Sequence, residues 1–151
     1  MRSRSNRPAP RSVAMPELAD RLRRRSRKVT GPRRAILKIL REHPHPMSIK
    51  EVFAELGKQD CDLATVYRSM HLLEEMGMVK RFDFGDGGAR FELLEEGDDG
   101  HHHHLVCLQC SAVVEIAECF PMELQERIAH ANGFKRVTHR LEFFGVCPRC
   151  Q

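Results

Sequence analysis

The chain has 151 residues, and its 41% of apolar residues suffice for the core of one domain or of two small ones. Its apolar runs fall short of the roughly 20 residues that span a bilayer, and the arginine-rich start lacks the apolar segment of a signal peptide. These features exclude a membrane-spanning or exported protein and predict a cytoplasmic one with no membrane partner.

The net charge of +4 is unevenly distributed along the chain. Residues 1–40 contain 13 Lys and Arg against 2 Asp and Glu, a net charge of +11, whereas residues 41–93 carry −3 and residues 94–151 carry −4. A basic N-terminal part indicates a polyanionic partner whose phosphates it neutralises. The alternative is a solvated arm, since residues 1–16 are rich in Arg, Ser and Pro and are predicted to be disordered.

Four helices are predicted from the helical spacing of apolar residues, from N-capping residues and from glycine stops. They are a short arginine-rich helix from Pro16 through Leu22, a second from the cap Thr30 to about Arg41, a third from the cap Ser48 to Gly57, and a fourth from Leu63 to Met76 whose Val66, Met70, Leu73 and Met76 face inward.

Two strands, Met78–Phe84 and Ala89–Leu94, are predicted on either side of the hairpin turn Gly85–Gly88. Helices followed by a hairpin describe a winged helix, in which the last helix enters the DNA major groove and the hairpin touches the backbone. We therefore predict an α+β protein. Its parts are a disordered basic arm (1–16), a winged-helix DNA-binding domain (17–96) and a small α/β metal-binding dimerisation domain (97–151), with a flexible acidic boundary near residues 97–100.

The last third of the chain is predicted to form a small unit of mixed structure. Its expected elements are a strand Val113–Ile116, a helix from about Pro121 to Ala131 before Gly133, and strands around Phe134–Val137 and Leu141–Phe144. About 50 residues bury little apolar surface, so zinc binding and dimerisation are expected to contribute to its stability.

Two Cys-x-x-Cys motifs predict a structural zinc site in this unit. Each motif lets two thiolates reach one ion from a tight turn, and two motifs complete the tetrahedral shell that structural zinc prefers. The four ligands are Cys107, Cys110, Cys147 and Cys150. The two remaining cysteines, Cys61 and Cys119, are predicted to be small, buried or partly buried residues rather than ligands.

Four consecutive histidines, His101–His104, lead into the first of these motifs. If they lie on a strand, His101 and His103 point to one face while His102 and His104 point to the other, so that one tract can serve two metal sites. Imidazole suits zinc, iron, manganese or nickel. An exposed polar loop or an expression tag is the alternative, although tags are usually terminal and longer.

Five motifs together resemble the ferric uptake regulator superfamily, which includes iron, zinc, manganese and peroxide sensors. In chain order they are Gly-Pro-Arg-Arg (31–34), Ala-Thr-Val-Tyr-Arg (64–68), Arg-Phe-Glu (90–92), His-His-His-His-Leu-Val-Cys-x-x-Cys (101–110) and Gly-Val-Cys-x-x-Cys (145–150). The resemblance implies a homodimeric, metal-activated repressor that binds double-stranded operator DNA.

The resemblance also implies site residues, carried over by position. The regulatory metal site bridging the two domains would use His45, Glu92, His102, His104 and Glu115. A second, optional site would use His101, His103 and His139, with Glu123 in place of an acid that the family often has at Met122. The residues that contact DNA would be Arg33, Thr65, Tyr67 and Arg68.

Oxygen and nitrogen ligands favour iron(II) or manganese(II) as the regulatory metal of a repressor of metal homeostasis genes. A zinc(II)-uptake or peroxide-stress regulator is the alternative, but peroxide sensors typically have aspartates at Glu92 and Glu115, and zinc sensors usually add a regulatory cysteine. A zinc hydrolase or deaminase would need a His-x-Glu or His-Glu-x-x-His motif, and this sequence has neither. A zinc chaperone or storage protein would not need a winged helix.

Overall fold

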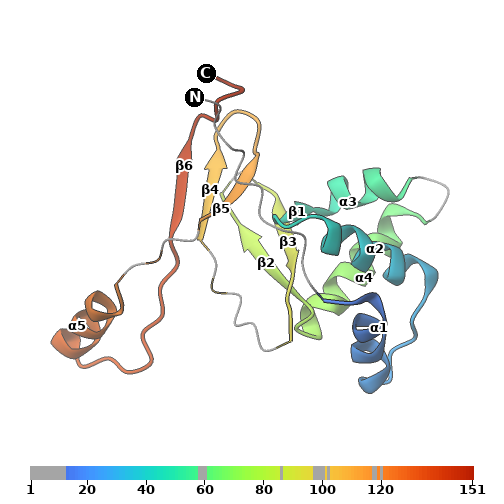
Figure 1. The fold of residues 1–151 in the computed structure, drawn as a ribbon, viewed down its shortest axis with the longest axis horizontal. Coiled ribbons are helices and arrows are strands. Elements are labelled where there is room, and N and C mark those ends of the chain that lie inside the picture. Colours follow the sequence, from blue (N-terminus) through green and yellow to red (C-terminus); the bar gives the residue numbers. More distant parts are fainter. Residues whose placement is uncertain are drawn as a thin grey trace. The chain divides into compact units, whose positions relative to one another are not determined.

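The computed structural model describes residues 13–57, 61–85, 87–96, 101, 103–116, 119 and 121–151. Its contacts divide the chain into two compact units, Met1–Gly100 and His101–Gln151, and the chain mixes helices with sheets, which confirms the predicted α+β class (Figure 1). Most of the predicted basic arm, the predicted boundary at 97–100 and His102 lie outside the described residues. No helix in the described ranges is long and apolar enough to cross a membrane.

The first unit is a winged helix, as predicted, with element boundaries within one or two residues of those expected. Its three-stranded antiparallel sheet has the order β1-β3-β2. The elements are α1 (Met15–Arg24), α2 (Gly31–Glu42), β1 (Met47–Ser48), α3 (Ile49–Leu56), α4 (Leu63–Glu75), β2 (Val79–Asp83) and β3 (Ala89–Leu93).

The strand β1 was not predicted from the sequence. It has only two residues, and it pairs with β3 through Met47 opposite Phe91 and Ser48 opposite Arg90. Such a short strand has no periodicity of its own, because its pairing depends on a hairpin more than 40 residues away in the chain. Its effect is to attach the start of α3 to the sheet.

One continuous apolar core fills the first unit. The predicted inward face of α4 is confirmed, since Val66, Met70 and Leu73 are fully buried and Met76 is 7% exposed. The helix α1 joins the same core through Leu18 and Leu22, which lie one helical turn apart. The opposite face of α4 is exposed, and Tyr67 on that face is 44% exposed.

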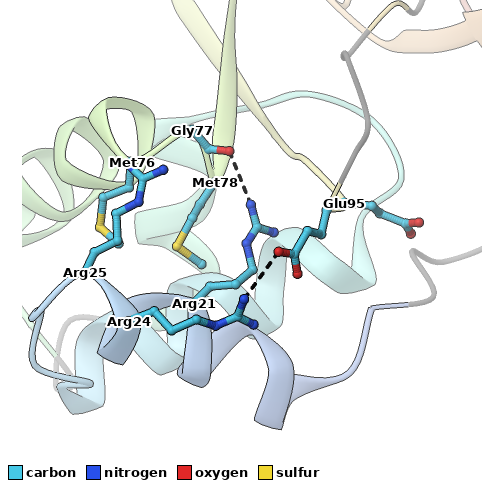
Figure 2. A pocket seen from close by; sticks show the side chains of 8 residues that line it. Arg21, Arg24, Arg25, Met76, Gly77, Met78 and Glu95 are labelled. Carbon is cyan, nitrogen blue, oxygen red and sulfur yellow. Dashed lines mark hydrogen bonds and ion pairs between the residues drawn. The ribbon is translucent and has the colours of Figure 1, made fainter.

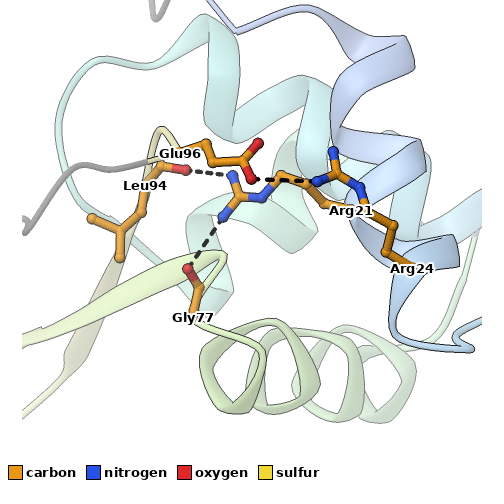
Figure 3. A network of polar contacts seen from close by, with 5 residues as sticks. All are labelled: Arg21, Arg24, Gly77, Leu94 and Glu96. Atoms are coloured by element: carbon orange, nitrogen blue, oxygen red, sulfur yellow. Dashed lines mark hydrogen bonds and ion pairs between the residues drawn. The ribbon is translucent and has the colours of Figure 1, made fainter.

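A polar clamp also holds α1 against the sheet (Figure 3). The Arg21 guanidinium donates to the Leu94 carbonyl at 2.8 Å and to the Gly77 carbonyl at 3.3 Å, so it joins the end of β3 to the turn that follows α4. Arg24 forms an exposed ion pair with Glu96 at 3.4 Å. Arg21, Arg24 and Arg25 line a hollow of about 340 Å³ beside this turn (Figure 2).

The helix starts differ in how they are capped. The Ser48 hydroxyl accepts from the Glu51 N–H at 3.2 Å, and the Glu51 carboxylate accepts from the Ser48 N–H at 2.7 Å, which makes a reciprocal capping box. Thr30 stands at the N-cap position of α2 as predicted, but its side chain makes no capping hydrogen bond. At α4, the hydroxyl and the amide of Thr65 hydrogen-bond the Asp62 carboxylate and lower its pKa.

The second unit has a three-stranded sheet of order β5-β4-β6, in which β4 is antiparallel to β5 and parallel to β6. The predicted strand at Phe134–Val137 is wrong, because this segment is irregular and Arg136 has a left-handed φ of 56° that interrupts an extended run. The observed elements are β4 (His103–Cys107), β5 (Val113–Ile116), α5 (Met122–Asn132) and β6 (Glu142–Gly145).

Thr30 and Ser48, the N-cap residues of α2 and α3, allow a matched test of helix capping. Ser48→Ala should destabilise the winged-helix unit by about 1 kcal/mol, because it leaves the Glu51 N–H without its acceptor. Thr30→Ala should cost clearly less, since the Thr30 side chain makes no such bond. Urea denaturation of both variants measures the difference, and equal losses would contradict this account of the caps.

Candidate metal centres

Four cysteine sulfurs converge where strands β4 and β6 end. The parallel pairing of β4 and β6 places Cys107 opposite Gly145, so the two Cys-x-x-Cys turns lie side by side. All four Sγ atoms lie within 4.8 Å of one another, and the Sγ atoms of Cys110 and Cys147 are 3.7 Å apart. A disulfide would require about 2.05 Å. A zinc tetrahedron with Zn–S bonds of ~2.3 Å has S···S edges of roughly 3.8 Å, so the donor set fits zinc.

The turns supply hydrogen bonds that favour thiolates. Backbone N–H groups of Cys110, Cys147 and Gln109 are directed at the Cys107 sulfur and lower the pKa of its thiol to about 6. Burial raises the pKa of Cys147, but hydrogen bonds, among them one from the Arg149 backbone, outweigh it and the net shift is downward.

The pKa of one thiol in the cluster, that of Cys150, is raised instead. Hydrogen bonds with the Cys147 and Cys110 thiols raise the pKa of Cys150 to about 12. Four negative sulfurs at these distances repel one another, so the cluster retains a proton unless a cation balances the charge. A divalent ion at the centre, such as a structural zinc, would balance the negative charge, so the cluster could release this proton.

A second cluster gathers three of the histidines predicted for the optional site. His101 precedes β4, His103 begins it, and His139 lies in the segment between α5 and β6. The ring centroid of His101 lies 4.8 Å from that of His103 and 4.6 Å from that of His139. Burial, followed by the charges of His101 and His139, lowers the pKa of His103 and so favours the neutral imidazole, which is the form that binds metals.

The fourth member of this cluster corrects two expectations. Glu123, the acid expected to complete the site, is not among the residues that converge there. Cys119, expected to be a small buried or partly buried residue, is exposed, and its Sγ lies 3.2–3.4 Å from an Nε2 atom of each of the three histidines. The sequence signal that could have found it is its position shortly after a strand that pairs with the histidine-bearing one.

The residues predicted for the regulatory site fall in both units. In the second unit, His104 and Glu115 are direct partners across β4 and β5, so their side chains share one face of the sheet. In the first unit, Glu92 lies on β3 next to Phe91, which pairs with Met47, and His45 lies two residues before Met47. The fifth predicted ligand, His102, lies outside the described residues.

The residues predicted to contact DNA occupy α2 and the exposed side of α4. Arg68 Nη2 donates to the Thr65 hydroxyl at 3.1 Å, which orients the guanidinium, and Tyr67 stacks on His71 with ring centroids 6.5 Å apart. Arg33 is half-buried and donates to the Lys28 carbonyl at 2.8 Å, so part of its hydrogen-bonding capacity already supports the loop before α2.

This combination of fold and sites matches a known protein family. The sequence pattern of the Ferric uptake regulator family matches residues 24–144. The chain belongs to the ferric uptake regulator family. The Ferric uptake regulation protein of Bacillus subtilis (strain 168) is 40% identical over 128 residues, which cover 83% of this chain and 86% of that protein.

Solved structures of family members agree with this assignment. The Vibrio cholerae ferric uptake regulator superposes with a TM-score of 0.73 at 32% identity, covering 86% of this chain and 99% of that one. A zinc-bound manganese uptake regulator superposes with a TM-score of 0.71 at 36% identity, covering 86% and 98%. Because the ferric uptake regulators are metal-responsive transcriptional regulators, the family membership also decides against the hydrolase and deaminase alternative.

The four-cysteine cluster predicts one tightly held zinc for this family member. Cys107→Ser should lower the zinc content of the purified protein by close to one equivalent per chain, because the remaining three thiolates leave the tetrahedron open. It should also unfold or monomerise the second unit. Elemental analysis with sedimentation and circular dichroism measures both effects, and Cys61→Ser is the matched control. A zinc-replete, folded and dimeric Cys107→Ser protein would refute the assignment.

Proposed function

We propose that the protein is a cytoplasmic, metal-activated repressor that binds operator duplex DNA as a homodimer, with iron(II) or manganese(II) as its regulatory ion. The observation that carries the proposal is the division of α4 into two faces. Val66, Met70 and Leu73 lock one face into the core, and Tyr67 and Arg68 stand on the exposed one. A rigid helix with polar and aromatic groups on its free side is how winged helices read a major groove.

Arg68 is the residue of this helix best prepared to read bases. Its guanidinium is oriented by the Thr65 hydroxyl. The backbone N–H of Thr65 in turn donates to the carboxylate of Asp62, the N-cap residue of α4, at 2.6 Å. A pre-oriented guanidinium loses little side-chain entropy when it makes a bidentate contact to guanine O6 and N7. Tyr67 offers an aromatic edge beside this guanidinium. Arg33, at the start of α2, would contact a DNA phosphate and so position the protein on the duplex.

The regulatory ion is assigned to ligands from both units, as the resemblance to the family implies. His104 and Glu115 form one pair of donors, and His45 and Glu92 form the other, with His102 as the fifth ligand. Two carboxylates with imidazoles make an oxygen- and nitrogen-rich set, which suits iron(II) and manganese(II) better than a sulfur-rich set would. The ferric and manganese uptake regulators among the relatives support the same two metals.

Dimerisation would use the apolar surface of the second unit. Leu105 on β4 pairs with Val114 on β5 and Phe143 on β6, which makes a row across the sheet, and these side chains are 42%, 46% and 45% exposed. In the described part of this unit, only Val106 and Cys107 are buried apolar residues. A second copy of the chain would bury this row and give the unit the core that it lacks.

Metal binding would act by population shift. An ion at about 100 times its dissociation constant stabilises the state that binds it by about 2.7 kcal/mol, which is enough to switch a two-state equilibrium with a gap of that size. The DNA-reading helices of a dimer must be spaced by about one helical turn of DNA, roughly 34–36 Å, to enter successive major grooves. The metal-bound state would be the one with that spacing.

The exposed face of α4 predicts a specific loss of DNA binding. Arg68→Ala should weaken binding to a duplex selected from random sequences with manganese(II) by about 1–3 kcal/mol and relax its base preference, because a base contact is lost. Tyr67→Ala should also weaken selective binding. Fluorescence anisotropy at several salt concentrations measures this, with Arg127→Ala on α5 as the control for lost charge. An Arg68→Ala protein with unchanged preference would contradict the assignment of α4.

The regulatory ligands predict loss of metal response without loss of fold. His104→Ala and Glu92→Ala should each retain one zinc and the dimer, but should no longer gain DNA affinity when iron(II), manganese(II) or zinc(II) is added, because the state that binds DNA loses its ion. The measurement is a titration of DNA binding with each metal at fixed protein. A normal metal response in both variants would exclude these residues as the sensor, and the metal that acts at the lowest free concentration identifies the subtype.

A further inference from the structure

A cysteine outside both Cys-x-x-Cys motifs stands at the centre of the second cluster. The Cys119 Sγ lies 3.3 Å from His101 Nε2, 3.2 Å from His103 Nε2 and 3.4 Å from His139 Nε2. The four residues come from separate places in the second unit: before β4, on β4, after β5 and before β6. The convergence of four donors from separate segments on one point is unusual for side chains that have no common ligand.

We propose that Cys119, as thiolate, joins His101, His103 and His139 in a four-coordinate site with three nitrogen donors and one sulfur donor. The site is built for a borderline-soft divalent cation of the zinc and cobalt(II) class rather than for manganese(II) or magnesium. It goes beyond the proposed repressor function, because the regulatory ion is assigned there to other residues and to harder donors.

The distances agree with a tetrahedral ion. Bonds of ~2.3 Å to sulfur and ~2.0–2.1 Å to nitrogen at tetrahedral angles give N···S separations of roughly 3.5 Å. The three observed N···S distances of 3.2–3.4 Å are close to that value. A small outward shift of the exposed Cys119 sulfur would bring these distances to the expected value.

Hydrogen bonding alone would hold this arrangement only with one particular set of protons on the three rings and the thiol. A thiol has a single hydrogen, so Cys119 can donate to one imidazole at a time, and the other two rings would have to donate from Nε2. At His139 the Nδ1 atom lies 2.7 Å from the Gln125 side-chain carbonyl oxygen, which can only accept, so the ring carries its hydrogen at Nδ1. A neutral His139 that donates from Nδ1 presents a lone pair at Nε2, which faces the Cys119 sulfur and suits a cation.

Gln125 is the positioning residue of this site. Its side-chain amide nitrogen donates to the Val137 carbonyl, which fixes the direction of the amide and leaves the oxygen facing His139. The contacts of Gln125 thus select the tautomer and the ring orientation of His139 that leave Nε2 available. Partners of this kind behind a ligating histidine typically change metal affinity by about 10- to 100-fold.

The donor set decides which ions the site prefers. Thiolate favours zinc, cobalt(II) and other soft or borderline ions, whereas manganese and magnesium prefer carboxylate and water. The acid expected at this site, Glu123, is absent from the cluster, and a cysteine takes the fourth position. A site with sulfur in place of a carboxylate oxygen therefore responds to a different metal from the proposed regulatory site.

Cobalt(II) spectroscopy tests the sulfur ligand directly. Dimeric protein that already holds one zinc per chain is titrated with cobalt(II), and the thiolate-to-cobalt charge-transfer band in the near ultraviolet is recorded alongside zinc release. The wild type and the control Cys61→Ser should gain the band within one equivalent of cobalt, with no zinc released. Cys119→Ser should bind cobalt at least about 10-fold more weakly and lack the band. The same band in Cys119→Ser would overturn the proposal.

Three further variants separate a metal site from a merely structural cluster. Gln125→Leu, which cannot accept from His139, should weaken cobalt binding by about 10- to 100-fold, and Gln125→Glu, which keeps an acceptor, should restore most of it. Cys119→Asp should shift the preference toward manganese(II), measured as the ratio of zinc to manganese affinities. Equal cobalt affinity in both Gln125 variants, or an unchanged ratio in Cys119→Asp, would count against the proposal. None of these readouts uses DNA, so their failure would leave the operator-binding tests untouched.

Discussion

The parallel pairing of β4 with β6 is the constraint on which the second unit depends. It sets Cys107 opposite Gly145 and thereby brings two distant Cys-x-x-Cys turns to one point. Burying one apolar side chain such as Val106 contributes about 1.5–3 kcal/mol, whereas a structural zinc in a small domain is worth roughly 10–16 kcal/mol. In a unit whose described residues bury so little apolar surface, an ion held by four thiolates would dominate the stability.

The alternation of side chains along β4 then distributes chemistry between the two faces of one strand. His103 points into the cluster with Cys119, while its neighbour His104 is paired with Glu115 across the strand interface. Two metal sites with different donors can therefore be built from adjacent residues, one with sulfur and one with carboxylate. Their different hardness would let the protein keep responses to different ions apart.

The first unit applies a different principle, because its stability comes from an apolar core rather than from ligands. The buried faces of the four helices and the sheet form one cluster, and the hydrogen bonds of Arg21 reinforce the attachment of α1 to it. This construction leaves Tyr67 and Arg68 of α4 exposed and outside the core. Tyr67 and Arg68 can therefore be replaced with little effect on folding, so their replacement tests recognition rather than stability.

Much of this protein follows from local sequence signals. Capping residues, glycine stops and helical spacing determine α1 to α4 to within a residue or two, because these are short-range preferences of the backbone. The spacing within Cys-x-x-Cys and the alternation of His101 to His104 depend only on the geometry of a turn and of a strand, so the groups of cysteines and histidines could be anticipated.

The tertiary structure alone decided the remaining features, because they depend on contacts between segments that are distant in the chain. Strand β1 exists only through its pairing with β3, and Arg136 interrupts the strand expected at Phe134–Val137. Cys119 and Gln125 carry no motif that marks them as parts of a metal centre. Cys119 joins the cluster because the chain after β5 returns to the histidines of β4, and Gln125 because α5 lies beside the segment that holds His139.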